Sequence, residues 1–131
     1  MPEFSQKSLN KLNTCDERLQ RIFHQVINFF DCTILEGHRG QLAQDRAYKE
    51  GKSQLKWPEG KHNKIPSIAV DVIPYPIDWN DRERMSYFAG FVKGIATSMN
   101  INIRWGGDWD SDTQVNDNNF DDLVHFELQD A

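Results

Sequence analysis

The chain has 131 residues, of which 38% are hydrophobic, and 15 basic side chains stand against 20 acidic ones, a formal net charge of −5. This length predicts one domain, and the acidic balance argues against nucleic acid or an anionic membrane surface as the main partner. The mean hydropathy is −0.70, and no apolar run approaches the roughly 20 residues that cross a bilayer, so we expect no membrane insertion.

The N-terminal part of the chain is predicted to contain helices around one short strand. Its first residues lack the apolar core of a secretory signal, so we expect synthesis as a cytoplasmic protein. Residues 17–30 have helical periodicity, with Leu19, Phe23 and Val26 on one face. The β-branched segment 32–36 predicts a strand, and residues 41–50 predict a helix that ends at Gly51. Two cysteines without CxxC spacing predict core residues and no disulfide framework.

The C-terminal part is predicted to hold three strands and one long helix. Residues 52–66 are polar and rich in proline, which predicts a long ordered loop, and 68–73 predicts a strand buried on both faces. A helix follows Asn80 or Asp81 and buries a face that runs from Met85 to Met99. Residues 101–105 and 123–128 predict short strands on either side of an acidic loop. This order of elements predicts a small α+β domain with an antiparallel or mixed sheet.

Three residues offer the ligands of a catalytic metal. Asp71 lies inside a buried strand, where a carboxylate costs several kcal/mol unless it is paired or binds a metal. His62 precedes it by nine positions and His125 lies in the last strand; two imidazoles and a carboxylate leave a fourth zinc position for water. A second interpretation stays open, in which His62 is exposed, Asp71 caps a backbone turn and His125 is a core histidine. His38 is a competing ligand.

Two acids and one arginine are candidates for chemistry beside that site. Asp122 precedes His125 by three residues, so in a continuous strand the two side chains would point to opposite faces. A turn at Asp121-Asp122 would instead bring Asp122 over the site as a general base. Glu127 shares the strand face of His125, where it would support a ligand or act as the base itself. Arg39 suits a substrate carboxylate or an oxyanion, unless it forms a surface salt bridge.

The acidic loop offers a second set of oxygen ligands. Asp108, Asp110 and Asp112 alternate along it, and Asn116, Asp117 and Asn119 follow. Alternating oxygens suit calcium, but Thr113 and Asn119 do not fit an EF-hand. The loop is either a calcium site or a solvated polar segment; calcium binding would order it and bring Asp122 into place.

Several motifs occur in a familiar order. They are residues 36–39 with Gln44, residues 61–62 followed by 69–71, and residues 122–127, with further support from 75–79, 88–94 and 103–109. From about residue 17 onward the chain resembles the D-alanyl-D-alanine carboxypeptidase / L-alanyl-D-glutamate endopeptidase family of zinc peptidases, and small phage endolysins most of all. It departs in two places: Gly60 stands where the family usually has serine, and His62 and Asp71 are nine apart rather than the typical seven.

The resemblance implies a fold, a site and a reaction. The fold is a small α+β domain with a mainly antiparallel sheet, spanning residues 1–131 as one catalytic domain without a separate cell-wall-binding domain. By this resemblance we expect His62, Asp71 and His125 to hold zinc, Asp122 to be the catalytic base, and Arg39 to bind the substrate or the transition state. The reaction is hydrolysis of the L-alanyl-D-glutamate amide in the peptidoglycan stem peptide.

Two alternatives accompany that expectation. One is D-alanyl-D-alanine carboxypeptidase activity at the end of the stem. The other, of a different class, is a zinc-bearing domain of the same fold that binds a partner without hydrolysis; the presence of Asp122 favours the enzyme. We expect a monomer that is cytoplasmic on synthesis, in the host cytoplasm for a phage protein, and that acts on the cell wall after release.

Overall fold

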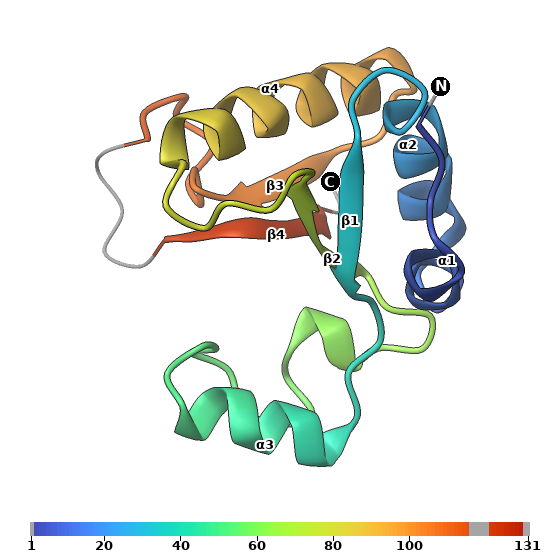
Figure 1. Ribbon diagram of the computed structural model, residues 1–131. Helices are drawn as coiled ribbons and strands as arrows, with labels where there is room; N and C mark the ends of the chain where they lie inside the picture. The colour runs from blue at the N-terminus through green and yellow to red at the C-terminus, as the bar shows by residue number, and fades with distance from the viewer. Residues whose placement is uncertain (1, 116–120, 130–131) are drawn as a thin grey trace.

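A computed structural model describes residues 2–115 and 121–129. One sheet with the strand order β1-β2-β4-β3 organises the chain, and every neighbouring pair in it is antiparallel (Figure 1). The strands are β1 (Cys32–Glu36), β2 (Ala69–Pro74), β3 (Ile103–Gly106) and β4 (Asp122–Leu128). The helices are α1 (Gln6–Leu12), α2 (Glu17–Val26), α3 (Gln41–Lys49) and α4 (Arg82–Ser98), with a short 3-10 helix, η1 (Lys61–Asn63). The prediction of an α+β domain with a mainly antiparallel sheet is confirmed.

Side chains at the helix starts explain where three helices begin. Ser5, Asp16 and Asp81 cap α1, α2 and α4 by accepting hydrogen bonds from backbone amides of the first turn. The predicted helix over residues 17–30 ends early, at Val26. After Val26 the backbone hydrogen bonds join residues three apart, as in a 3-10 helix: the Asn28 amide donates to the Gln25 carbonyl, and the Phe29 amide donates to the Val26 carbonyl. The apolar residues beyond Val26 therefore lie in turns and not in the α-helix.

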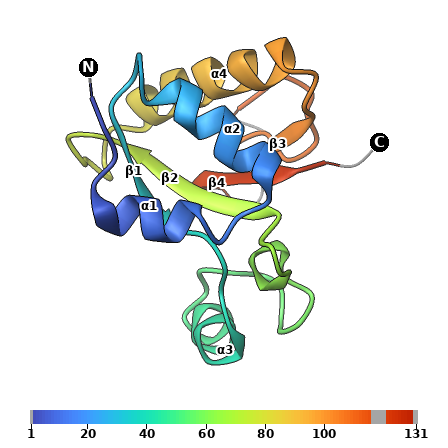
Figure 2. The same cartoon turned by 90° about the vertical axis from the view of Figure 1, so that its right-hand side faces the viewer.

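One face of the sheet carries the hydrophobic core. Helices α2 and α4 lie across this face, and α1 packs beside β1 (Figure 2). Val70 and Val72 of β2 and Phe126 of β4 meet the apolar faces of both helices. Both cysteines are buried and free, as predicted. Among the described helices, none combines the length and apolar character that crossing a membrane requires.

The opposite face of the sheet carries charge. Side chains along a strand point to alternate faces. Asp71, between the core residues Val70 and Val72, therefore points to the charged face, and so does His125, which precedes the core residue Phe126.

The predicted strand over residues 101–105 begins at Ile103 instead, because the Ile101 amide bonds to the Ala96 carbonyl and belongs to the turn that ends α4.

A second structural unit, the α3 lobe (residues 38–66), lies apart from the sheet in both views (Figures 1 and 2). The long loop predicted over residues 52–66 is interrupted, because residues 61–63 form η1. Backbone bonds fasten the lobe at its base, from the Arg39 amide to the His62 carbonyl (2.8 Å) and from the Ile68 amide to the Lys61 carbonyl (3.3 Å). The lobe therefore returns His62 to the charged face of the sheet.

A candidate metal centre

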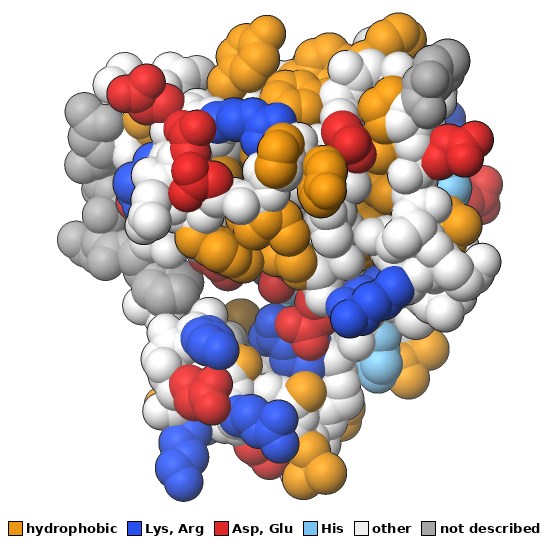
Figure 3. All heavy atoms as spheres, in the orientation of Figure 1, with side chains coloured by type: hydrophobic (Ala, Val, Ile, Leu, Met, Phe, Trp, Pro, Cys, Tyr) orange, Lys and Arg blue, Asp and Glu red, His pale blue; other side chains and the backbone are white. Residues whose placement is uncertain are grey.

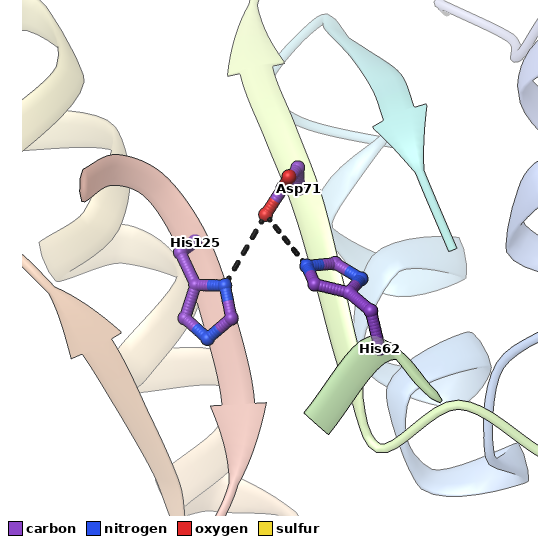
Figure 4. Close-up of side chains that lie close together, drawn as sticks. All are labelled: His62, Asp71 and His125. Carbon is purple, nitrogen blue, oxygen red and sulfur yellow. Dashed lines mark hydrogen bonds and ion pairs between the residues drawn. The ribbon is translucent and has the colours of Figure 1, made fainter. Parts of the chain in front are cut away.

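Three side chains converge on one point of the charged sheet face (Figure 4). Asp71 of β2 and His125 of β4 are direct partners in the antiparallel register. Asp71 Oδ1 lies 3.3 Å from Nδ1 of His125 and 3.1 Å from Nε2 of His62. One ligand atom from each residue lies within 4.8 Å of the other two. The segment carrying His62 therefore folds back onto the strand that follows it, nine residues before Asp71.

The hydrogen bonds of His62 favour a cation at this point. Its Nδ1 lies 2.7 Å from the Gly37 carbonyl, which only accepts, so Nδ1 carries a proton. In a neutral imidazole Nε2 then presents a lone pair, and this lone pair faces another acceptor, the Asp71 carboxylate. Either a second proton or a metal ion must lie between the two groups.

His125 is held between acceptors in the same way. Its Nε2 lies 2.8 Å from Glu127 Oε1, while Nδ1 faces Asp71. Burial lowers the pKa of His125, but the hydrogen bonds with Asp71 and Glu127 outweigh it and raise the pKa to about 9. Glu127 accepts from Arg104 with its other oxygen at 2.8 Å, which fixes its position. Glu127 thus orients the imidazole with Nδ1 toward the metal position.

Asp71 supplies the negative charge of the centre. Burial would raise the pKa of its carboxyl, but His62 and His125 outweigh burial and hold the pKa well below its ordinary value. An ionised carboxylate and two oriented imidazole nitrogens match the three-ligand donor set of a catalytic zinc, whose fourth position is taken by water or substrate. The side chains present therefore fit a zinc ion.

Asp122 reaches the same site through a break in strand pairing. Trp105 pairs with Phe126 but the next residue, Gly106, pairs with Asp122, so the register shifts between them. This shift interrupts the alternation and brings Asp122 Oδ2 to 4.0 Å from His125 Nδ1. Gly106 permits the approach, because a side chain there would run into the Asp122 carbonyl.

The environment of Asp122 differs from that of Asp71. Burial, together with repulsion from Asp71, raises the pKa of Asp122 to about 6. A carboxyl with a pKa close to neutral is suited to accept and return a proton. One acid of the site is thus held ionised, and the other is placed to exchange a proton.

Arg39 is fixed beside these acids. Its guanidinium donates to Glu36 Oε2 at 2.8 Å and to Gln44 Oε1 at 3.0 Å, and it lies 3.6 Å from Asp71 Oδ2. The side chain is only 11% exposed, so a surface salt bridge does not describe it. Several groups hold the charge in one orientation at the edge of the metal centre.

Gln44 links Arg39 to the rest of the α3 lobe, and it was identified from the sequence only as part of a family motif. It is completely buried, and its Oε1 also accepts from Asn63 at 3.2 Å. Its Nε2 donates to Ser53 Oγ and to the Leu55 carbonyl. All four hydrogen bonds of the amide are therefore made. Helical periodicity gave no signal for it, because a polar residue at a buried position is recognised only from its partners.

The replacement of serine by Gly60 has a local explanation. The Gly60 amide donates to Asn63 Oδ1 at 2.9 Å. A Cβ at position 60 would lie 2.6 Å from the same oxygen and 3.0 Å from Gln44 Oε1. The Asn63 amide thus fills the space that a residue-60 side chain would occupy.

A cleft of about 460 Å³ opens onto the metal centre between the α3 lobe and the sheet. Residues 53–55 and Lys61 line it on the lobe side, and Arg104 and Trp109 on the sheet side. A second cavity, of about 740 Å³, shares Arg39, Lys52 and Asp122 with the first. Figure 3 shows the hollow between the α3 lobe and the body of the molecule, with acidic and basic side chains gathered along it.

The remaining candidates lie elsewhere. His38 is not part of the metal centre: its Nδ1 lies 3.1 Å from the Lys64 carbonyl. Asp108, Asp110 and Asp112 do converge within 4.8 Å, but backbone amides of residues 112–114 donate to their carboxylates. Calcium binding stays a prediction. Asn116, Asp117 and Asn119 lie outside the described residues.

Known proteins resemble this chain in sequence and in structure. The model of a family described as phage L-alanyl-D-glutamate peptidase matches residues 2–129. The crystal structure of the L-Ala D-Glu endopeptidase ChiX of Serratia marcescens is similar with a TM-score of 0.76, at 24% sequence identity over 96% of this chain and 89% of that chain. None of the curated proteins matches the sequence.

Proposed function

The chain belongs to the phage L-alanyl-D-glutamate peptidase family, and from that premise we propose how it works: zinc held by His62, Asp71 and His125 assists hydrolysis, with Asp122 as the general base. Its substrate is peptidoglycan, and the bond is the amide between L-alanine and D-glutamate of the stem peptide. The family resemblance inferred from the sequence motifs is confirmed.

One observation carries the assignment of a metal. Each of the two imidazoles lies between two acceptors, and in each the nitrogen remote from Asp71 is engaged by an oxygen of the protein. The two nitrogens nearer to Asp71 are therefore left for a cation. Two imidazoles and one carboxylate favour zinc over calcium or magnesium, which prefer oxygen ligands alone.

The proton transfers follow from the position of Asp122. Bound zinc would polarise the scissile carbonyl and lower the pKa of a water molecule. Asp122 takes a proton as the water oxygen bonds to the carbonyl carbon of L-alanine, and it delivers that proton to the amide nitrogen. The carbon–nitrogen bond then breaks, which leaves a new carboxylate on L-alanine and a new amino group on D-glutamate.

Arg39 supports the same step electrostatically. Negative charge develops on the carbonyl oxygen during the attack, and a guanidinium fixed by Glu36 and Gln44 needs no reorganisation to stabilise it.

The position of Asp122 beside His125 supports an enzyme over a domain that only binds a partner. A domain that only binds a partner does not require a proton acceptor at this position.

Mass spectrometry of digested muropeptides tests the reaction. We expect new fragments that begin with D-glutamate, formed by the zinc-loaded protein and absent after chelation. Asp122→Asn loaded with zinc is the matched control, because its ligands are intact. Release of D-alanine would assign the carboxypeptidase reaction instead, and intact muropeptides in the presence of bound zinc would favour the non-catalytic alternative.

A further inference from the structure

Four basic side chains line the cleft over the metal centre: Arg39, Lys52, Lys61 and Arg104. Three of them already have a carboxylate partner: Arg39 with Glu36 at 2.8 Å, Arg104 with Glu127 at 2.8 Å, and Lys52 with Glu50 at 3.3 Å. For Lys61, no ion pair is found within residues 2–115 and 121–129. The cleft therefore contains one cation whose counter-charge the described protein does not supply.

The backbone of Lys61 is fixed although its charge is not paired. Lys61 begins η1 and directly precedes the proposed ligand His62. Its carbonyl accepts from the Ile68 amide at 3.3 Å, and the next carbonyl, of His62, accepts from Arg39. The residue is half-buried and lines the same cleft as Asp122 and His125. The backbone of Lys61 is thus fixed next to the proposed ligand His62, and its side chain is part of the wall of the cleft.

The substrate carries a charge that needs such a partner. In the stem peptide the chain continues through the γ-carboxyl of D-glutamate, so the α-carboxylate is free, on the carbon that bears the scissile nitrogen. A carboxylate that loses water on entering a cleft is costly unless a cation or hydrogen-bond donors replace the water. Arg39 is already engaged by Glu36 and Gln44.

We propose that Lys61 recognises the α-carboxylate of D-glutamate, and thereby makes the enzyme selective for stems with a free carboxylate over stems in which that group is amidated to D-isoglutamine. This inference rests on the proposed cleavage between L-alanine and D-glutamate. Lys61 acts here as a specificity-determining residue, and Arg39 remains the group that stabilises the transition state.

Two synthetic stem peptides, identical except for D-glutamate or D-isoglutamine, test the proposal against variants of residue 61. We expect the zinc-loaded wild type to show a kcat/KM about tenfold or more higher for the D-glutamate peptide, the size of effect of a hydrogen bond to a charged group. Lys61→Gln should abolish this preference by lowering only the D-glutamate value. Lys61→Arg, which keeps the charge, should retain it.

Lys64→Gln is the matched control, because it removes the same charge three residues away, at an exposed position that does not line the cleft. Binding gives a second readout: in an Asp122→Asn background, where the peptide stays intact, Lys61→Gln should weaken affinity for the D-glutamate peptide alone. Zinc content should be unchanged in every variant.

Two results would overturn the role of Lys61: a wild type that cleaves both peptides equally, or a Lys61→Gln enzyme that keeps the wild-type preference. Failure of the proposed function looks different, because mass spectrometry would then find no product with an amino-terminal D-glutamate or D-isoglutamine from any variant.

Discussion

The two faces of the sheet are built from the same strands and stabilised by different forces. On one face Val70, Val72 and Phe126 are buried under α2 and α4, and hydrophobic burial stabilises the contact. On the other face Asp71 and His125 are almost as well buried, yet their neighbours are charges and hydrogen-bond acceptors. Successive side chains of each strand point to alternate faces, so of two residues adjacent in sequence one packs in the core and the other belongs to the site.

The difference shows what the site requires from the fold. Helix packing on the core face fixes β2 and β4, and this rigid pair holds Asp71 and His125 in register. The α3 lobe faces the charged side of the sheet across the cleft, and hydrogen bonds through Gln44 and Arg39, rather than an apolar core, hold the lobe together. Substitutions on the core face should therefore change the stability of the fold, and substitutions on the charged face should change metal binding and catalysis.

The largest contrast is expected between neighbours on opposite faces. His125→Ala should lose both zinc and activity, because one of three protein ligands is gone. Phe126→Ala should retain about one zinc per chain but lose about 3–5 kcal/mol of the free energy of unfolding, because it leaves a cavity in the core. Metal analysis and chemical denaturation measure the two effects. Full zinc content in His125→Ala would show that the ligand is wrongly assigned.

Asp122→Asn should keep zinc and fold but lose about 10²–10⁴-fold in rate, since the amide cannot accept a proton. Glu127→Gln is the informative comparison, because Glu127 bonds to His125 without facing the metal position. If Glu127→Gln were inactive with zinc bound and Asp122→Asn nearly normal, Glu127 would be the base.

Arg39→Lys should lower kcat by about tenfold or more, because lysine keeps the charge but cannot donate to Glu36 and Gln44 in the same planar geometry. Zinc content should not change. Steady-state kinetics on a purified muropeptide separate the possibilities: an effect on KM alone would assign Arg39 to ground-state binding of the substrate.

The smallest effect concerns stability of the metal-free protein. The pKa of Asp122 is raised to about 6, so folding disfavours its ionised form and wild type loses stability as pH rises from about 4 to about 6. Asp122→Asn does not titrate. It should be more stable than wild type by about 1–3 kcal/mol above pH 6, with the difference shrinking toward pH 4.

Thermal unfolding in a chelator, across that pH range, measures the difference. Asp45→Asn, at an exposed position on α3, controls for the loss of one acidic charge. A stability gain for Asp122→Asn that is the same at pH 4 and pH 7 would mean that ionisation of Asp122 is not its cause.

Much of the charged face could be predicted from the sequence because strands alternate with a period of two. That alternation made Asp71 anomalous within an apolar run and placed Glu127 on the same face as His125. The pairing of Asp71 with His125 depends in addition on β2 and β4 being neighbours in one particular antiparallel register.

The positions of Asp122, His62 and Gln44 depend on tertiary contacts, which the periodicity of the sequence does not indicate. Asp122 reaches the site through a register shift opposite Gly106, and the sequence offers a turn at Asp121-Asp122 only as one way to bring it there. His62 depends on a 3-10 turn and on the Gly37 carbonyl, and Gln44 on four partners from separate segments. These are tertiary hydrogen bonds: those of Gln44 form only when the α3 lobe is folded, and that of His62 forms only when the lobe meets the end of β1.

The most direct test is a zinc titration of the chelated protein, followed by the appearance of peptides with an amino-terminal D-glutamate. Activity should rise linearly with added zinc and level off at about one equivalent per chain, and His125→Ala should show no rise at the same zinc concentrations. Full activity in the chelated protein, with no zinc detected, would contradict a metal centre formed by His62, Asp71 and His125.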